Sequence, residues 1–350
     1  MGKAAPLFTV VIPTWNRRNS VLRCLDSVLS QDWDAYEVII VDDDSSDGTV
    51  SALEKYTDDR LKILRHSVNR GVCAARHTGT LASSGRWIIS IDSDVEVLPH
   101  GLSLMAGRML SASKDVGSLI FMAYYEKLGL LPDGILEAGR VENLTIPSLS
   151  PDNVPVFGKP FGLETYMKWA QKSVCSAAFI CHRREVFDLV QWPTDRRLEF
   201  QFHLRFYEHW EGMFQQEVVG IYHEDAPFAI SSDRSEMGVR REMAFAADRA
   251  RAHQEILEEF GARMQEWAPH LYFDVLWEAS YLHFQSGQRS RGLRYAVLAL
   301  LNNPSAWQVY PLVVAGMAGP GVIRALRTLK DVRVLAQKSI SRGVTRKIGP

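Results

Sequence analysis

The segment YEVIIVDDDSSDGT, residues 36–49, joins a mostly apolar run to a cluster of turn-forming residues. The run from Tyr36 to Val41 predicts a strand that ends abruptly at Asp42. The Asp, Ser and Gly residues that follow favour a turn, and Ser46 or Asp47 can cap a helix that continues to about Tyr56. The segment therefore predicts one strand, one loop and one helix in succession.

The same pattern recurs along the first 122 residues. Further strands are predicted at 8–12, 61–64, 87–91 and 116–122, with helices at 19–30, at 72–82 and from Pro99 onward. Strands that are continuous apolar runs are buried on both faces, and helices between them imply a mostly parallel sheet. The predicted fold class is α/β, with a Rossmann-like mixed, mostly parallel sheet flanked by helices. In such sheets ligands bind beyond the carboxyl ends of the strands.

The rest of the chain changes character twice. Residues 123–172 are irregular, and a strand at 173–181, a helix from about Glu199 and a strand at 217–222 follow. From about Met237 the sequence is helical. We expect a domain at 1–235, with a first half at 7–122 and a second half at 123–235, and then a helical region at 236–350.

Charge and hydropathy limit the classes of function. The 40 basic and 41 acidic residues nearly cancel, so nothing favours bulk binding to nucleic acid. The most apolar C-terminal run, Val309 to Ile323, is shorter than a membrane span and contains two prolines. No secretory signal is visible at the start of the chain. We therefore expect a cytoplasmic protein.

The last residues are strongly basic. Residues 324–347 carry eight Lys or Arg side chains against Asp331 alone, interleaved with Leu, Val and Ile. A basic amphipathic segment can lie on an anionic membrane surface, at the inner face of the membrane in this case. A solvated basic tail fits the same composition. The helical region could equally serve as a homodimer surface or as a scaffold.

Two carboxylates lie one residue apart in Asp92-Ser93-Asp94, just past a predicted buried strand. Holding such like charges together is costly unless a positive group lies between them. Carboxylate oxygens suit Mg²⁺ or Mn²⁺, which also take phosphate oxygens and water. A cation at this place could neutralise a diphosphate leaving group. A capping Asp beside a solvated Asp is the simpler alternative for this motif.

Four motifs occur in order along the first domain: VIPTWNR at 11–17, VDDDSSDGT at 41–49, NRGVCAARHTG at 69–79 and DSD at 92–94. In these motifs the chain resembles the family 2 glycosyltransferases over about residues 7–225. The resemblance implies the GT-A fold, a nucleotide diphosphate sugar donor, a bound Mn²⁺ or Mg²⁺ ion, and transfer with inversion. A UDP-sugar is the favoured donor.

The resemblance also implies roles on the donor side. Pro13, Trp15 and Arg17 would line the base pocket, and Asp42 or Asp43 would accept a hydrogen bond from the base. Arg70 and Arg76 would contact ribose or phosphate. Asp92 would bind ribose or reach the metal through water, beside Ser93. Asp94 would ligate the metal, with His223 as a further ligand.

On the acceptor side, family members carry a stretch like EDxDLxxR at the start of a helix. The corresponding stretch here is LEFQFHLR, residues 198–205, and alignment on Arg205 makes Glu199 the candidate general base. Leu198 and Gln201 replace acids of the family pattern. Asp195 is the reserve candidate. An inverting transfer needs such a base to remove the proton of the acceptor hydroxyl.

The resulting hypothesis is a metal-dependent glycosyltransferase that acts on a glycan or lipid-linked acceptor in polysaccharide or glycoconjugate biosynthesis. One alternative is a non-catalytic module that kept the nucleotide pocket. The other is a dinucleotide-dependent oxidoreductase, which would need a glycine-rich loop where this chain has PTWNR at 13–17.

Overall fold

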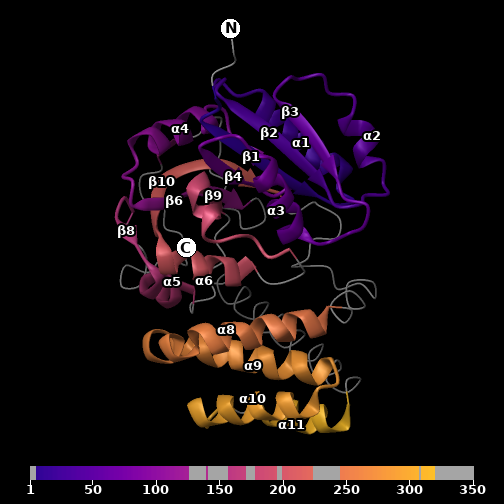
Figure 1. Cartoon of the computed structure of the whole chain (residues 1–350), viewed down its shortest axis with the longest axis vertical. Helices are drawn as coiled ribbons and strands as arrows, with labels where there is room; N and C mark the ends of the chain where they lie inside the picture. The colour runs from indigo at the N-terminus through magenta and orange to yellow at the C-terminus, as the bar shows by residue number, and fades with distance from the viewer. Residues whose placement is uncertain are drawn as a thin grey trace, which may run out of the picture. The chain divides into compact units, whose positions relative to one another are not determined.

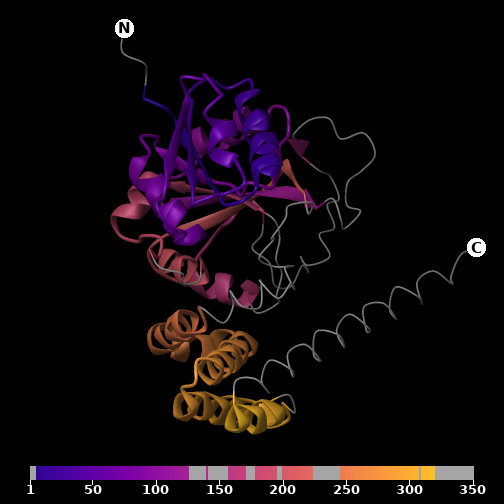
Figure 2. The ribbon, with the colours of Figure 1, turned by 90° about the vertical axis from the view of Figure 1, so that its right-hand side faces the viewer.

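The computed structural model describes residues 5–125, 139–140, 157–170, 178–194, 199–223, 245–306 and 309–319. The chain forms two compact units, Met1–Gly238 and Val239–Pro350. The first unit contains a mixed sheet with helices packed on it, and the second contains helices (Figures 1 and 2). The α/β class and the helical C-terminal region predicted from the sequence are confirmed.

The sheet of the first unit has the strand order β3-β2-β1-β4-β9-β6-β10-β5. The first half, β3 to β4, is parallel, whereas β9 lies antiparallel between β4 and β6, and β5 is antiparallel to β10. The strands are β1 (Phe8–Thr14), β2 (Tyr36–Asp42), β3 (Leu61–Arg65), β4 (Trp87–Ser90), β5 (Val95–Val97), β6 (Val116–Tyr125), β7 (Gly139–Arg140), β8 (Pro160–Phe161), β9 (Ala178–Arg183) and β10 (Glu211–Tyr222). Six strands of the main path therefore point the same way, as a mostly parallel sheet requires.

Helices follow most strands in this unit. They are α1 (Arg18–Leu29), α2 (Thr49–Leu53), α3 (Val72–Ala82), α4 (Gly101–Ser111), α5 (Leu163–Ala170) and α6 (Glu199–His209), with a short 3-10 helix, η2 (Arg184–Asp188). The β1–β2–β4 region is buried on both sides. Val10 and Ile12 belong to the main core with α1, whereas Ile39 and Val41 belong to a second cluster with Ala75 of α3. Burial on both faces explains why these strands show no apolar alternation.

Helix α3 packs directly onto β1. A Cβ atom added at Gly79 would lie 2.4 Å from Cγ1 of Val11 and 3.3 Å from Cγ2 of Val41. Only a residue without a side chain allows this approach. The contact holds the second half of α3 close to β1 and β2.

Some elements are longer than predicted, and others were not predicted. The strand expected at 217–222 is the end of the 12-residue β10, and the strand expected at 116–122 continues to Tyr125. The prediction at 173–181 lies partly outside the described residues, which show β9 over Ala178–Arg183. The three-residue β5 and the helix α5 were not predicted, because β5 is too short to show a period and α5 lies in an irregular segment.

The second unit contains α8 (Ala246–Trp267), α9 (Pro269–Gln285), α10 (Arg289–Asn302) and α11 (Val309–Ala318). Helix α9 packs against α8, α10 and α11, and α10 packs against α11. Phe284 of α9 is fully buried, and Cβ atoms added at Gly292 or Gly316 would lie within 2.6 Å of its ring. No helix of the described residues is long and apolar enough to cross a membrane. The basic segment 324–347 lies outside the described residues.

Candidate active site

Both acidic turns lie at one edge of the sheet, on either side of β1. Strand β1 pairs in parallel with β2, with Thr14 opposite Asp42, and in parallel with β4 on its other side. Asp42 ends β2, and Asp92-Ser93-Asp94 follows β4 after one residue, Ile91. Neighbouring strands are about 4.8 Å apart, so the two turns are separated by roughly 10 Å across β1. This arrangement could place both turns on one extended ligand.

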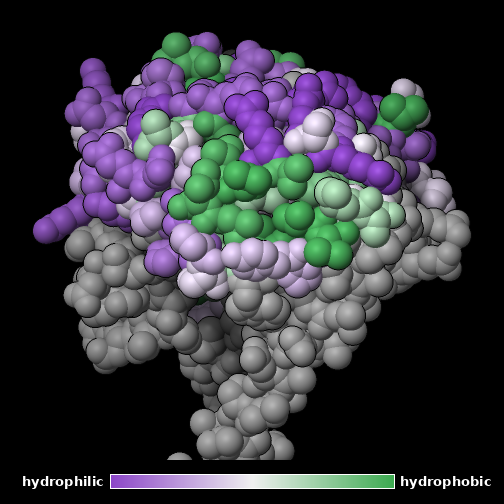
Figure 3. All heavy atoms as spheres, turned by 90° about the horizontal axis from the view of Figure 1, so that it is seen from below, coloured by the Kyte–Doolittle hydropathy of each residue, from purple (hydrophilic) through white to green (hydrophobic). Residues whose placement is uncertain are grey.

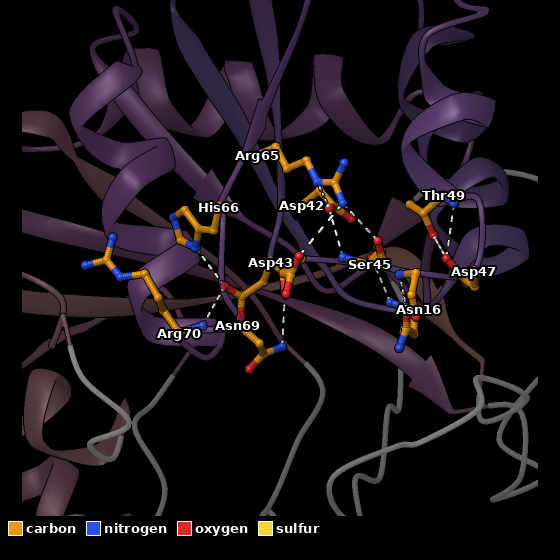
Figure 4. Close-up of polar contacts among 12 residues, drawn as sticks. Asn16, Asp42, Asp43, Ser45, Asp47, Thr49, Arg65, His66, Asn69 and Arg70 are labelled. Atoms are coloured by element: carbon orange, nitrogen blue, oxygen red, sulfur yellow. Dashed lines mark hydrogen bonds and ion pairs between the residues drawn. The ribbon is translucent and has the colours of Figure 1, made fainter.

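Asp43 holds together the loop that precedes α3 (Figure 4). Its Oδ1 accepts the backbone N–H of Arg70 at 2.9 Å and lies 2.7 Å from Nδ1 of His66, and its Oδ2 accepts the N–H of Gly71 at 2.7 Å. Its carbonyl oxygen accepts a hydrogen bond from the Asn69 side chain. The carboxylate thus lies beside the N-terminus of α3, where negative charge is favoured. One lone pair of Oδ2 remains for a further donor.

Asp42 is more enclosed than Asp43. Its side chain is fully buried, its Oδ2 accepts the N–H of Ser45 at 3.0 Å, and Arg65 Nε lies 3.6 Å away. Oδ1 has no hydrogen-bond partner among the described residues. Asp42 is fully buried and stabilises the turn. Asp43 is 3% exposed and keeps a lone pair on Oδ2, so Asp43 is the better placed of the two to meet a nucleobase.

The loops after β1 and β2 are tied to each other. The amide N–H of Asn16 donates to Ser45 Oγ at 2.8 Å, and the Asn16 side-chain oxygen accepts the N–H of Ser46 at 2.8 Å. Asp47 accepts backbone N–H groups at the starts of both α1 and α2, from Arg18 and Thr49. Burial would raise the pKa of Asp47, but these hydrogen bonds outweigh it and lower the pKa. The two loops therefore form one preorganised rim.

Arg17 lies at the predicted metal ligand. Its Nη1 is 2.7 Å from Oδ2 of Asp94, whose side chain is only 3% exposed. Oδ1 of Asp94 is buried without a hydrogen-bond partner among the described residues. Burial raises the pKa of Asp94, and the charge of Arg17 opposes that rise. Arg17 was expected to line the base pocket, whereas this geometry places its guanidinium on the side of Asp94.

Arg76 links the donor-side acid Asp92 to the candidate base. One guanidinium nitrogen is 2.8 Å from Oδ1 of Asp92, and the other is 2.7 Å from Oε1 of Glu199. His203 Nε2 lies 3.5 Å from the same oxygen of Glu199. Burial would raise the pKa of Glu199, but Arg76 and His203 hold it well below its usual range. Glu199 is therefore charged, as a general base must be, although its basicity is reduced.

Aromatic side chains fix the position of α6, which begins at Glu199. Trp192 stacks on Phe202 with ring centroids 3.8 Å apart, and the Arg76 guanidinium lies over the Trp192 ring at 5.4 Å. On the α5 side, Tyr166 stacks on Tyr207 at 4.4 Å. This packing gives the carboxylate of Glu199 a rigid support, as a catalytic group needs.

The other predicted residues have these positions. Pro13 is buried in β1 opposite Val41, Ser93 is buried, Trp15 is half-buried and Arg70 is exposed. The N–H of His223 donates to the carbonyl of Asp94, while its Nε2 lies 2.9 Å from Oε2 of Glu96. Metal ligation by His223 stays a prediction, and Asp195 lies outside the described residues.

A family model described as glycosyl transferase family 2 matches residues 9–188, which is more than half of the chain. The chain belongs to glycosyl transferase family 2. The match covers both acidic turns and the strands that carry them. It ends before Glu199, so the position of the base does not follow from this match.

Two curated proteins are similar to part of the chain. The succinoglycan biosynthesis protein ExoO of Rhizobium meliloti is 31% identical over 150 residues, 43% of each chain. The UDP-Glc:alpha-D-GlcNAc-diphosphoundecaprenol beta-1,3-glucosyltransferase WfgD of Escherichia coli is 32% identical over 104 residues, 30% of this chain and 41% of the relative. The chain thus spans about two-fifths of the length of these relatives. The crystal structure of S. aureus TarS 1-349 is 17% identical, with 94% of this chain and 91% of that chain covered and a TM-score of 0.49.

The site offers one carboxylate oxygen, from Asp94, that fits a divalent cation. Oδ1 of Asp94 is a hard oxygen ligand, buried and without a donor in the described part of the chain. Within that part, no group of three acidic, His or Cys side chains is assembled around one point. Mg²⁺ and Mn²⁺ are commonly held by one or two carboxylates, with phosphates and water completing the shell. Asp94 therefore fits a cation that arrives together with a diphosphate.

Several functional contacts were not predicted. His66 carries no motif signal, yet it bridges Asp43 and the Thr78 hydroxyl at 2.7 and 2.9 Å. The pairing of Arg76 with Glu199 joins residues 123 positions apart, which no local pattern can show. Only the presence of Arg76 within the 69–79 motif pointed to a role for this arginine.

Proposed function

We propose that this chain is a metal-dependent glycosyltransferase that moves a sugar from a nucleotide diphosphate sugar to a hydroxyl group of a glycan or lipid-linked acceptor. The observation that carries the proposal is the joint placement of the two acidic turns on either side of β1, with Arg76 connecting Asp92 to Glu199. Membership of glycosyl transferase family 2 supports the reaction class.

A UDP-sugar is the proposed donor. Asp43 has a spare lone pair on Oδ2, and a carboxylate there would accept the imide N–H of uracil. The name of the relative WfgD includes UDP-Glc as its donor, which supports the same choice. The diphosphate of the donor would extend from the uracil toward Asp94, and Asp94 would hold Mn²⁺ or Mg²⁺. The cation would supply charge neutralisation of the leaving diphosphate.

Glu199 is the proposed general base. It would take the proton of the acceptor hydroxyl as the oxygen attacks C1 from the side opposite the leaving group, so the anomeric configuration inverts. Arg76 forms an ion pair with Glu199. A diphosphate offers Arg76 competing oxygens, and movement of the guanidinium toward them would release Glu199 as a stronger base.

The test is a screen of nucleotide sugars with Mn²⁺ or Mg²⁺, followed by Glu199→Gln. We expect turnover of a UDP-sugar, a loss of at least about a hundredfold in Glu199→Gln, and nearly unchanged donor binding. Glu164→Gln is the matched control, because Glu164 is an exposed glutamate of α5 that pairs only with Lys168 in the described structure. Full turnover in Glu199→Gln would reject Glu199 and move the role to Asp195. Donor binding without any transfer or hydrolysis would instead favour a non-catalytic module.

A further inference from the structure

Helices α10 and α11 carry two stripes of exposed apolar side chains. Leu293, Val297 and Leu301 recur every fourth residue on α10, and Tyr310, Val314 and Met317 recur at spacings of four and three on α11. Their exposed fractions run from 39% to 73%. Since α10 packs against α11, we define these six residues as the α10–α11 face. Figure 3 shows a continuous apolar area bordered by hydrophilic side chains.

Single exposed apolar residues need no explanation, but a contiguous area marks an interaction site. Six of the ten exposed large apolar side chains among the described residues belong to this face. None of the ten lies on α8 or α9, although those helices belong to the same unit. The apolar exposure is therefore concentrated on one pair of helices.

The charge along α10, α11 and the sequence that follows them is almost entirely positive. From residue 286 to the end of the printed sequence, Asp331 is the only acidic residue. The basic residues of the same stretch are Arg289, Arg291, Arg294, Arg324, Arg327, Lys330, Arg333, Lys338, Arg342, Arg346 and Lys347. Between Arg294 and Arg324 no residue is charged. The three arginines of α10 are exposed, so an uncharged surface is flanked by positive charge.

We propose that the α10–α11 face is a membrane-binding surface that lies on an anionic lipid bilayer. Apolar side chains would enter the boundary between headgroups and acyl chains, and the arginines would meet anionic headgroups. This inference does not depend on the proposed transfer reaction. It places the contact on a folded pair of helices and not on the basic segment 324–347 alone.

Charge disfavours the competing occupants. Two copies that met through this face in a symmetric dimer would bring the arginines of α10 together. The basic segment 324–347 would be repelled from the same border. A contact between this face and the α8–α9 side of a second copy is also disfavoured. It would bury the apolar stripes against helices that expose no large apolar side chain among the described residues. An anionic bilayer matches both the apolar area and the charge.

The experiment is sedimentation of the full chain with vesicles of phosphatidylcholine alone or of equal parts phosphatidylcholine and phosphatidylglycerol. We expect binding to the anionic vesicles only, weakened by salt. The double variant Leu301→Asp/Val314→Asp should lower the partition coefficient at least about tenfold. The matched control is Leu110→Asp/Leu189→Asp, which changes two similarly exposed leucines of the first unit and should bind like the parent protein.

Two further measurements separate the alternatives. Arg289→Gln/Arg291→Gln/Arg294→Gln should weaken binding to anionic vesicles by roughly a hundredfold, at about fivefold for each charge. Unchanged binding by Leu301→Asp/Val314→Asp would overturn the proposal, because segment 324–347 would then suffice. Failure of the parent protein to bind either vesicle would also overturn it, and a vesicle-free dimer lost in this double variant would assign the face to self-association.

Discussion

Replacement of Arg76 by Met tests whether Arg76 couples Asp92 to the proposed base Glu199. Arg76 is 6% exposed and makes ion pairs of 2.8 and 2.7 Å with Asp92 and Glu199. Exposed ion pairs contribute about 0.2–1 kcal/mol, and breaking a buried pair costs about 3–5 kcal/mol. The side chains of Asp92 and Glu199 are 36% and 41% exposed, so solvent screens both pairs. We therefore expect each ion pair to contribute about 1–2 kcal/mol to the free energy of unfolding.

The assay is a double-mutant cycle of Arg76→Met and Glu199→Gln, measured by urea unfolding at pH 7. The expected coupling free energy is about 1–2 kcal/mol. A second cycle, Lys168→Met with Glu164→Gln, changes an exposed pair at spacing i,i+4 and should give no more than about 0.5 kcal/mol. A coupling at Arg76 that does not exceed this control would refute the bridge.

The same variant has a predicted pH dependence. The pKa of Glu199 is depressed in the folded protein, so its contribution to stability is present above its ordinary value of 4.5 and is lost as the pH falls through the folded value. The stability difference between the parent protein and Arg76→Met should therefore shrink below about pH 4.5. In activity, loss of the arginine raises the pKa of Glu199, so the acid limb of kcat/KM should move to higher pH.

Two further predictions concern Asp94 and the α3 contact. Arg17→Gln removes the guanidinium that pairs with Asp94. Because a charge-assisted hydrogen bond then no longer competes with the metal, calorimetry without donor should show Mn²⁺ binding that is roughly tenfold tighter. Weaker Mn²⁺ binding would contradict the assignment of Asp94 as a metal ligand. Gly79→Ala should destabilise the first unit by about 1–3 kcal/mol in urea unfolding, because the new Cβ would lie 2.4 Å from Val11. Gly107→Ala in α4 meets nothing within 4 Å and should instead stabilise by up to about 1 kcal/mol, so equal effects would disprove the packing argument.

The sequence predicted the sheet edge well because the relevant signals are local. Continuous apolar runs that end at Asp42 and Asp92 require buried strands with acidic turns at their carboxyl ends, and the structure has both. The irregular segment before β9 hides α5, because α5 is positioned by contacts with distant elements: Tyr166 stacks on Tyr207 of α6, and Trp169 meets Phe214 of β10 edge-on. The pairings Arg17–Asp94 and Arg76–Glu199 depend on how segments far apart in the sequence meet in the fold. A sequence motif does not predict such contacts.

These two pairings have a common consequence for the order of events at the site. Asp94 and Glu199, the proposed metal ligand and base, are each paired with an arginine. If Asp94 held a cation, the Arg17 guanidinium would lose its charge pairing there and would be available to bind a phosphate oxygen. Metal and diphosphate would in this way strengthen each other's binding, by a coupling free energy that must be equal in both directions. If Mn²⁺ tightens UDP binding equally in the parent protein and in Arg17→Gln, this exchange of counterions does not occur, and the metal acts on the diphosphate without Arg17.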